Sequence, residues 1–239
     1  MIIRIVFFLL YACSHLSALE PIFVVFGPPG TGKGTFSQYI HEQYGYSHLS
    51  VGDVVREEIS LQTEIGKQAD ECLRKGDFLE EAMIQALVSK HLIPFLQNKT
   101  PVIIDGFPRT EESVYFIHNL FQQYNLSGQV LLIGLYADDA TCEKRILSRS
   151  ICGKCARIYN DYSCPPKQAN ICDSCFAQLK IRSNDNEAIA RKRLEEFHLV
   201  TEKAYRLAQT IFPSIEFSTS GSLEECLQNY TRFMTHDRP

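Results

Sequence analysis

A glycine-rich loop with a single lysine occupies residues 27–35, directly after the apolar run Ile22–Phe26. The order Gly-Pro-Pro-Gly-Thr-Gly-Lys-Gly-Thr predicts a strand that leads through a loop into a helix, with Lys33 at the helix start. In such a loop, successive backbone N–H groups turn inward on a polyphosphate, and the helix adds the positive end of its dipole. The glycines that permit this turn are Gly27, Gly30, Gly32 and Gly34. We therefore expect nucleotide binding at this loop.

Two side chains of the loop are expected to meet the nucleotide. Lys33 supplies a full positive charge to the terminal phosphates. The residue after the lysine is Gly34 rather than the usual serine or threonine, so Thr35 is the residue that offers a hydroxyl to Mg²⁺. An ordinary glycine-rich turn is the alternative, and the strand-loop-helix context favours the phosphate site over it.

Two Cys-x-x-Cys pairs form a second pattern, made of Cys152, Cys155, Cys172 and Cys175. Each two-residue gap lets one tight turn present two sulfurs, and two such turns complete a tetrahedron around Zn²⁺. Two disulfides or unpaired thiols are the alternatives. Four protein ligands leave no open coordination position, which indicates a structural ion. Because residues 151–181 contain few large aliphatic side chains, this ion would supply their folding energy, on the order of 10 kcal/mol or more.

Residues 102–110, between these two patterns, read Val-Ile-Ile-Asp-Gly-Phe-Pro-Arg-Thr. An apolar strand ends there in Asp105, and Arg109 follows after a short turn. Because the carboxyl ends of neighbouring strands meet at one crevice in a doubly wound sheet, we expect Asp105 to face the Mg²⁺ of the nucleotide. Arg109 would then face a second phosphate group.

Alternating strand and helix patterns predict an α/β fold, with a parallel sheet between two layers of helices. The expected strands are residues 22–26, 46–50, 102–105, 130–137 and 215–219. A long helix is expected over residues 187–212, with Ala190, Leu194, Phe197 and Ala204 buried. With 239 residues, of which 45% are hydrophobic and 22% charged, the chain can bury one core. Its net charge of -4 gives no reason to expect binding to nucleic acid or to a membrane surface.

The glycine-rich loop, the segment of residues 102–110 and the two cysteine pairs, in this order along the chain, resemble the adenylate kinase family, in its class with a long zinc-bearing lid. The resemblance runs from about Pro21 to the end of the chain. It implies a three-layer P-loop NTPase fold with a five-stranded parallel sheet, and reversible Mg-dependent phosphoryl transfer from ATP to AMP that gives two ADP. It also implies a core (residues 21–49, 80–148 and 186–239), a monophosphate-binding segment (residues 50–79) and a zinc-bearing lid (residues 149–185).

Residue roles follow from the same resemblance. Residues 50–56, Ser-Val-Gly-Asp-Val-Val-Arg, match a family segment, which implies that Ser50 lies at the acceptor site and that Arg56 and Arg109 clamp the acceptor phosphate. The other positions implied at the nucleotide site are Arg145 over the donor base, Arg149 at its phosphates, Tyr159 in the lid, and Arg182 and Arg193 on the transferring phosphoryl group. Phosphoryl transfer needs positioning and charge neutralisation more than a protein base, so the residues expected to act in catalysis are Lys33, Arg109, Arg149, Arg182 and Arg193.

Departures from the family pattern concern the base more than the phosphates. The family has a glutamine four residues after the arginine of Asp-Gly-Phe-Pro-Arg, which reads the adenine edge, and this chain has Ser113. Val51 replaces the usual threonine, and of the usual aspartate pair after Arg182 only Asp185 is kept. A kinase of another nucleoside monophosphate is therefore one alternative. A nucleotide-binding protein with little turnover is another, although a mere binder needs no acceptor clamp.

Residues 1–20 form a hydrophobic leader or extension. Arg4 precedes an uncharged apolar run, residues 5–13, which is too short to span a bilayer and has the length of a secretory signal core. A protein that uses ATP and keeps thiolates on zinc fits a reducing compartment, so we expect the cytoplasm, with export through this segment as the alternative. We further expect a monomer whose partners are ATP and AMP, or another nucleoside monophosphate, with no stable membrane partner.

Overall fold

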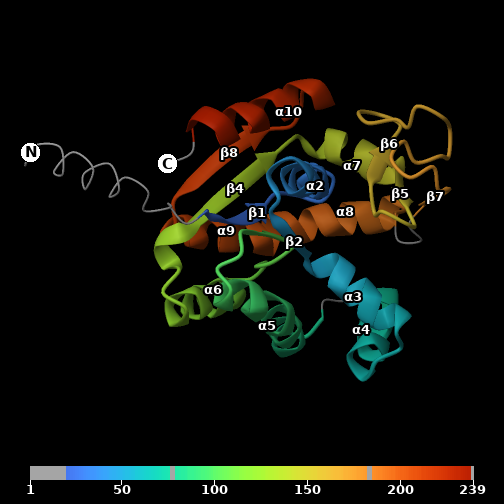
Figure 1. Ribbon diagram of the computed structural model, residues 1–239. Coiled ribbons are helices and arrows are strands. Elements are labelled where there is room, and N and C mark those ends of the chain that lie inside the picture. Colours follow the sequence, from blue (N-terminus) through green and yellow to red (C-terminus); the bar gives the residue numbers. More distant parts are fainter. Residues whose placement is uncertain (1–19, 76–78, 182–184, 238–239) are drawn as a thin grey trace, which may run out of the picture.

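Five parallel strands form the central sheet of the protein, seen in a computed structural model that describes residues 20–75, 79–181 and 185–237 (Figure 1). The strand order is β2-β3-β1-β4-β8. The strands are β1 (Ile22–Phe26), β2 (Ser47–Ser50), β3 (Val102–Asp105), β4 (Val130–Tyr136) and β8 (Ser214–Ser218). Their ends differ from the predicted ranges by one residue at most, and the predicted three-layer α/β fold with a five-stranded parallel sheet is confirmed.

Helices cover both faces of this sheet, as a parallel sheet requires. Because successive side chains of a strand point to opposite faces, Phe23 and Val25 of β1 enter one core, and Val24 and Phe26 enter the other. The first core is closed by α2 (Lys33–Tyr44), α10 (Leu223–Arg232) and η3 (Phe233–Asp237). The second is closed by α5 (Glu81–Gln97), α6 (Glu111–Gln123) and α9 (Glu202–Gln209), with the short turn η1 (Ser127–Gln129) leading into β4.

The predicted long helix is interrupted by a π-helical stretch. It consists of α8 (Glu187–Glu196), η2 (Phe197–Thr201) and α9. Ala190, Leu194 and Ala204 are buried as predicted. Phe197 is only half-buried and lines a cavity, so its predicted place in the core is wrong. A π turn is wider than an α turn and changes the direction of the side chains that follow, which the 3.6-residue period does not anticipate.

Two extensions leave the sheet on the same side, to the right in Figure 1. One is the helical arm of α3 (Val51–Ser60) and α4 (Glu64–Lys75), which follows β2. The other follows α7 (Asp139–Leu147) and contains a small antiparallel sheet in the order β6-β5-β7, built from β5 (Arg149–Cys152), β6 (Ile158–Asn160) and β7 (Leu179–Ile181). Among the described residues, no helix has both the length and the apolar character needed to cross a membrane. The predicted leader, apart from Glu20, and Arg182 lie outside these residues.

Candidate active site

A cavity of about 1480 Å³ opens where the strands β1, β2 and β3 end. The glycine-rich loop, the first turns of α3 and α6, and the two extensions line it. Twelve of the residues predicted for the site lie on its walls: Gly30, Gly32, Lys33, Gly34, Thr35, Ser50, Arg56, Asp105, Arg109, Arg145, Arg149 and Arg193. The structure therefore brings the predicted phosphate-handling residues together from segments far apart in the sequence.

The glycine-rich loop presents free helix-start amides to this cavity. Gly32 is the N-cap of α2, and it offers no side-chain cap to the first-turn N–H groups, which remain available for an anion. At Gly30 the backbone has φ +87°, and an added Cβ would lie 2.4 Å from the carbonyl oxygen of Cys142. Only glycine fits such a position, because the conformation and the close approach both exclude a side chain.

Lys33 lies in the loop with its ammonium group turned back on the backbone. Its Nζ donates hydrogen bonds to the carbonyl oxygens of Gly27 (2.7 Å) and Pro28 (2.9 Å). Burial lowers the pKa of Lys33 to about 8, although the nearby Asp105 carboxylate opposes this shift. A bound phosphate would favour the charged lysine and raise its pKa, so nucleotide binding and protonation are linked.

This linkage predicts a pH-dependent affinity for ATP. We expect the dissociation constant of ATP to change little between pH 7 and 8, and then to rise by up to about tenfold per pH unit as free Lys33 loses its proton. Calorimetry from pH 7 to 9.5 in two buffers of different ionisation enthalpy would measure both the affinity and the proton uptake. Adenosine, which has no phosphate, is the control and should show no such change. A constant ATP affinity up to pH 9.5 would contradict the assignment.

Two arginines line the cavity near the start of α3 and after β3. The Arg109 side chain donates a hydrogen bond from Nε to the carbonyl oxygen of Gly106 (2.9 Å). Arg56 forms an ion pair with Asp53 one helical turn away in α3. These contacts hold two positive charges at the start of α3 and after β3, where a second phosphate group can bind.

Asp185 positions two further arginines. Its fully buried carboxylate accepts hydrogen bonds from Arg149 Nε (2.7 Å) and Nη2 (2.6 Å), and Arg193 Nη1 lies 3.5 Å from the same carboxylate. Burial lowers the pKa of Arg193. The single carboxylate that the sequence keeps at this point therefore joins an arginine of β5 to one of α8, a role that sequence reasoning missed.

Arg145 and Arg149 are both shielded from solvent, the first buried and the second with its side chain 16% exposed. Arg145 is buried and donates to the carbonyl oxygen of Thr219 (2.6 Å) and to its hydroxyl (3.3 Å). Thr219 follows β8, so Arg145 ties α7 to the far edge of the sheet. Together with Gly221 and Leu223, these residues line one end of the cavity.

Asp105 ends β3 and lines the cavity beside the loop, with its Oδ2 3.9 Å from the position of a Cβ added at Gly34. On the adjacent strand β2, His48 lies with Nε2 at 3.9 Å from Asp105 Oδ2, a neighbour that sequence reasoning did not single out. Thr35 lines the same part of the cavity. A carboxylate and a hydroxyl are oxygen donors of the kind that Mg²⁺ prefers beside nucleotide phosphates.

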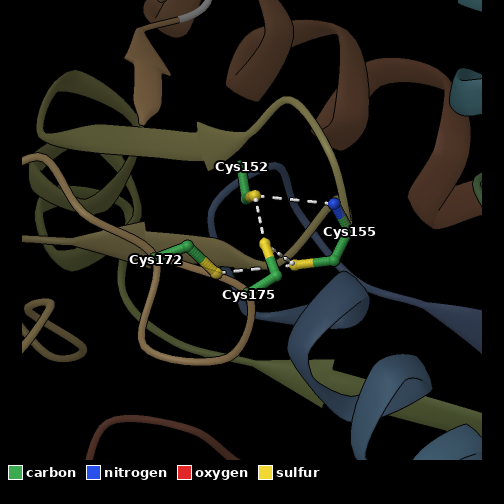
Figure 2. A group of neighbouring side chains, drawn as sticks. All are labelled: Cys152, Cys155, Cys172 and Cys175. Atoms are coloured by element: carbon green, nitrogen blue, oxygen red, sulfur yellow. Dashed lines mark hydrogen bonds between the residues drawn. The ribbon is translucent and has the colours of Figure 1, made fainter. Parts of the chain in front are cut away.

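The four predicted cysteine ligands converge in the second extension, and Figure 2 shows their sulfurs turned toward one another. Their Sγ atoms lie within 4.8 Å of one another, with Cys152 and Cys175 3.3 Å apart and Cys155 3.5 Å from Cys172. Disulfides need about 2.05 Å, so the pairs are not bonded. A tetrahedron with Zn–S bonds near 2.3 Å has sulfurs about 3.8 Å apart, and the cluster is close to that geometry.

Tyr159 belongs to this cluster rather than to the cavity wall. It is buried, its hydroxyl lies 3.4 Å from Cys172 Sγ, and that oxygen accepts a hydrogen bond from the backbone N–H of Asp173 (2.8 Å). Tyr159 was predicted at the nucleotide site, but it is not among the residues that line the cavity. Cys164, the remaining cysteine of this extension, is not a member of the four-sulfur group.

The cysteine-bearing segment lies over the glycine-rich loop. Arg157 donates two hydrogen bonds from Nη2 to the Glu42 carboxylate of α2, at 2.5 and 2.7 Å. The next residue, Ile158, approaches Gly34 so closely that an added Cβ there would lie 2.7 Å from its Cδ1 atom. An ion pair and an apolar contact thus hold the segment against the helix that carries Lys33.

Comparison with known proteins agrees with this geometry. The sequence model of the family described as "Adenylate kinase" matches residues 25–207, which contain the loop, both arginine pairs and the four cysteines. This chain belongs to the adenylate kinase family. It is accordingly a nucleoside monophosphate kinase, a phosphotransferase, and the resemblance found in the sequence motifs is confirmed.

Several curated relatives carry the same family name. "Adenylate kinase" from Thermococcus kodakarensis is 35% identical over 170 residues, 71% of this chain and 74% of that protein. "Adenylate kinase" from Pyrococcus abyssi is 31% identical over 202 residues, 84% of this chain and 90% of that protein. "Adenylate kinase" from Thermotoga neapolitana is 34% identical over 175 residues, 73% of this chain and 79% of that protein.

Ser113, which stands at the adenylate kinase family's base-reading glutamine, has a structural role. It is buried and is the third residue of α6, whose N-cap is Thr110. Its Oγ accepts hydrogen bonds from the backbone N–H groups of Arg109 (3.0 Å) and Thr110 (2.9 Å), and it donates to the Thr110 carbonyl oxygen (2.9 Å). Ser113 therefore fixes the turn that carries Arg109 and does not line the cavity.

Proposed function

We propose that this protein transfers the γ-phosphoryl group of Mg-bound ATP to AMP, reversibly, giving two ADP. The observation that carries the proposal is one cavity with two separate phosphate clamps. Lys33 and the free amides of α2 form the donor clamp, and Arg56 with Arg109 forms the acceptor clamp. A protein that only binds a nucleotide needs no second clamp.

The donor is held by backbone and lysine together. The first-turn N–H groups of α2 bind the phosphate oxygens, and Lys33 leaves the Gly27 and Pro28 carbonyls to meet the terminal phosphates. Arg145, placed at the end of the cavity beside Thr219, lies over the donor base. Asp105 and Thr35 would hold Mg²⁺ with its waters, an ion that neutralises phosphate charge when it is bound.

Transfer of the phosphoryl group depends on positive charges that are already in place before the reaction. Arg149 and Arg193, both held by Asp185, stabilise the negative charge that spreads over the moving phosphoryl group. Because Asp185 fixes them beforehand, they need little rearrangement during the reaction. Arg182 is proposed for the same task from the resemblance alone. The segment over the loop excludes water when it is closed, which favours AMP over water as the acceptor.

The four cysteines would hold Zn²⁺ as a structural ion, since their four thiolates complete its tetrahedron and leave no position for substrate. We propose that residues 149–185 act as a lid, residues 50–79 as the monophosphate-binding segment and the remaining residues from 21 onward as the core. The monomeric state and the cytoplasmic location stay predictions. The cytoplasm is predicted because zinc-bound thiolates persist in a reducing compartment.

A bisubstrate ligand tests whether both clamps work together. A compound that links two adenosines through five phosphates should bind at least about 100-fold more tightly than ATP, because it fills both clamps without a second association cost. The analogue with three bridging phosphates is the matched control and should lose most of this gain. Calorimetry would compare all three ligands on the natural protein and on Arg56→Ala, which should bind ATP normally. Equal affinity for ATP and the five-phosphate compound would contradict the proposed acceptor site.

A further inference from the structure

An apolar recess continues the cavity beyond the acceptor clamp. From Arg56 the lining passes to Val55 and Ile59 of α3, then to Leu79 and Ile84 at the start of α5. These four apolar residues pack together as one cluster. A monophosphate whose phosphate is held by Arg56 and Arg109 would place its base in this recess, since the walls are apolar and the charged clamp lies at its mouth.

The recess contains a fixed hydrogen-bond acceptor. Glu81, the first residue of α5, is half-buried and lines it. Its Oε2 accepts a hydrogen bond from the Thr110 hydroxyl (2.9 Å), and its Oε1 accepts one from Gln85 Nε2 (3.3 Å). Each carboxylate oxygen can accept more than one hydrogen bond, so Glu81 keeps accepting capacity for a ligand.

The residue expected to read the base does not reach this recess. The Ser113 hydroxyl is taken up by the turn before α6, and Thr110, the partner of Ser113 in that turn, is the residue that holds Glu81. This recess therefore offers a carboxylate, whereas the family pattern provides a neutral amide for the base. A carboxylate can only accept hydrogen bonds, whereas an amide can both accept and donate.

We propose that Glu81 reads the base of the acceptor monophosphate by accepting hydrogen bonds from its amino group, and thereby selects amino-bearing bases against uracil. Adenine, guanine and cytosine each present an exocyclic amino group on the pairing edge. Uracil presents one N–H between two carbonyl oxygens, whose lone pairs face the carboxylate unfavourably. This inference rests on the proposed function, because the location of the acceptor phosphate defines which recess takes the base.

The test compares equilibrium binding of AMP and UMP, measured by calorimetry with no donor present. Glu81→Gln keeps the size of the side chain, and its amide oxygen still accepts from Thr110, while its N–H₂ group can donate to a uracil oxygen. We expect the natural protein to prefer AMP, and the ratio of AMP to UMP affinity to fall roughly tenfold or more in Glu81→Gln. Glu111→Gln is the matched control, since Glu111 is exposed in the first turn of α6 and does not line the cavity.

An unchanged AMP to UMP ratio in Glu81→Gln, with normal ATP affinity and melting temperature, would overturn the inference. Equal affinity of the natural protein for AMP and UMP would overturn it as well, and so would an equal loss of selectivity in Glu111→Gln. Because these are binding measurements, they separate the two claims. If the ratio changes as expected but ATP and AMP yield no ADP, the proposed reaction fails and the role of Glu81 stands.

Discussion

Lys33→Ala is expected to lower the rate of phosphoryl transfer by a factor on the order of 10³ or more while the fold stays intact. The ammonium group of Lys33 lies at the start of α2, and its hydrogen-bond acceptors are the Gly27 and Pro28 carbonyl oxygens. Neither core of the sheet contains Lys33, so stability should change little. The charge is needed most while negative charge redistributes over the phosphates.

The measurement is a coupled assay of ADP formation from ATP and AMP, with melting temperature as the test of folding. Lys33→Arg is the matched variant, because it keeps a positive charge but spreads it over a planar group that cannot reach a phosphate oxygen in the same way. We expect its rate to lie between those of the natural protein and Lys33→Ala. A rate for Lys33→Ala within a few-fold of the natural value would refute the donor clamp.

Cys172→Ser is expected to remove the metal and to destabilise the lid far more than it alters the chemistry. Cys172 is fully buried and contributes one of four sulfurs that lie within 4.8 Å of one another. Residues 151–181 have little apolar core beyond this cluster, so loss of zinc removes folding free energy on the order of 10 kcal/mol from the segment. We expect a separate melting transition at lower temperature, with residual transfer when substrates saturate.

Elemental analysis under reducing conditions should find one zinc per natural chain and much less in Cys172→Ser. Cys164→Ser is the matched control, because Cys164 lies in the same segment and packs against the cluster but is not one of the four ligands. It should keep both the zinc and the melting temperature. Absence of zinc from the natural protein, or an equal loss in both variants, would rule out the predicted site.

Short-range patterns account for the predicted site residues that the structure brings to one cavity. The glycine-rich loop, the Asp105 to Arg109 turn and the two cysteine turns each lie within about ten residues of chain, so residue type and spacing alone constrain their geometry. The alternation of apolar runs likewise predicted the five strands to within one residue at each end. Phe197 shows the limit of such periodicity, because the 3.6-residue period assumes a continuous α-helix and a π-helical stretch begins at this residue.

Contacts between segments that are distant in the chain could not be predicted from the sequence. Asp185 joins Arg149 to Arg193, Arg145 reaches Thr219, and Arg157 meets Glu42, and each contact exists because the strand order places distant segments side by side. Ser113 shows the same limit, since only the folded turn reveals that its hydroxyl is already occupied.

The sequence by itself determined the fold class and the family, and it predicted the residues that we propose for phosphate binding. Phosphate binding by a loop is a local property, which glycine spacing and one lysine largely specify. Only the tertiary structure decided which carboxylate holds the arginines, how the cysteine-bearing segment contacts the loop, and that Glu81 rather than Ser113 lines the cavity. Hydrogen bonding and burial depend on neighbours that are distant in the chain, and the spacing of residues within a motif does not reveal those neighbours.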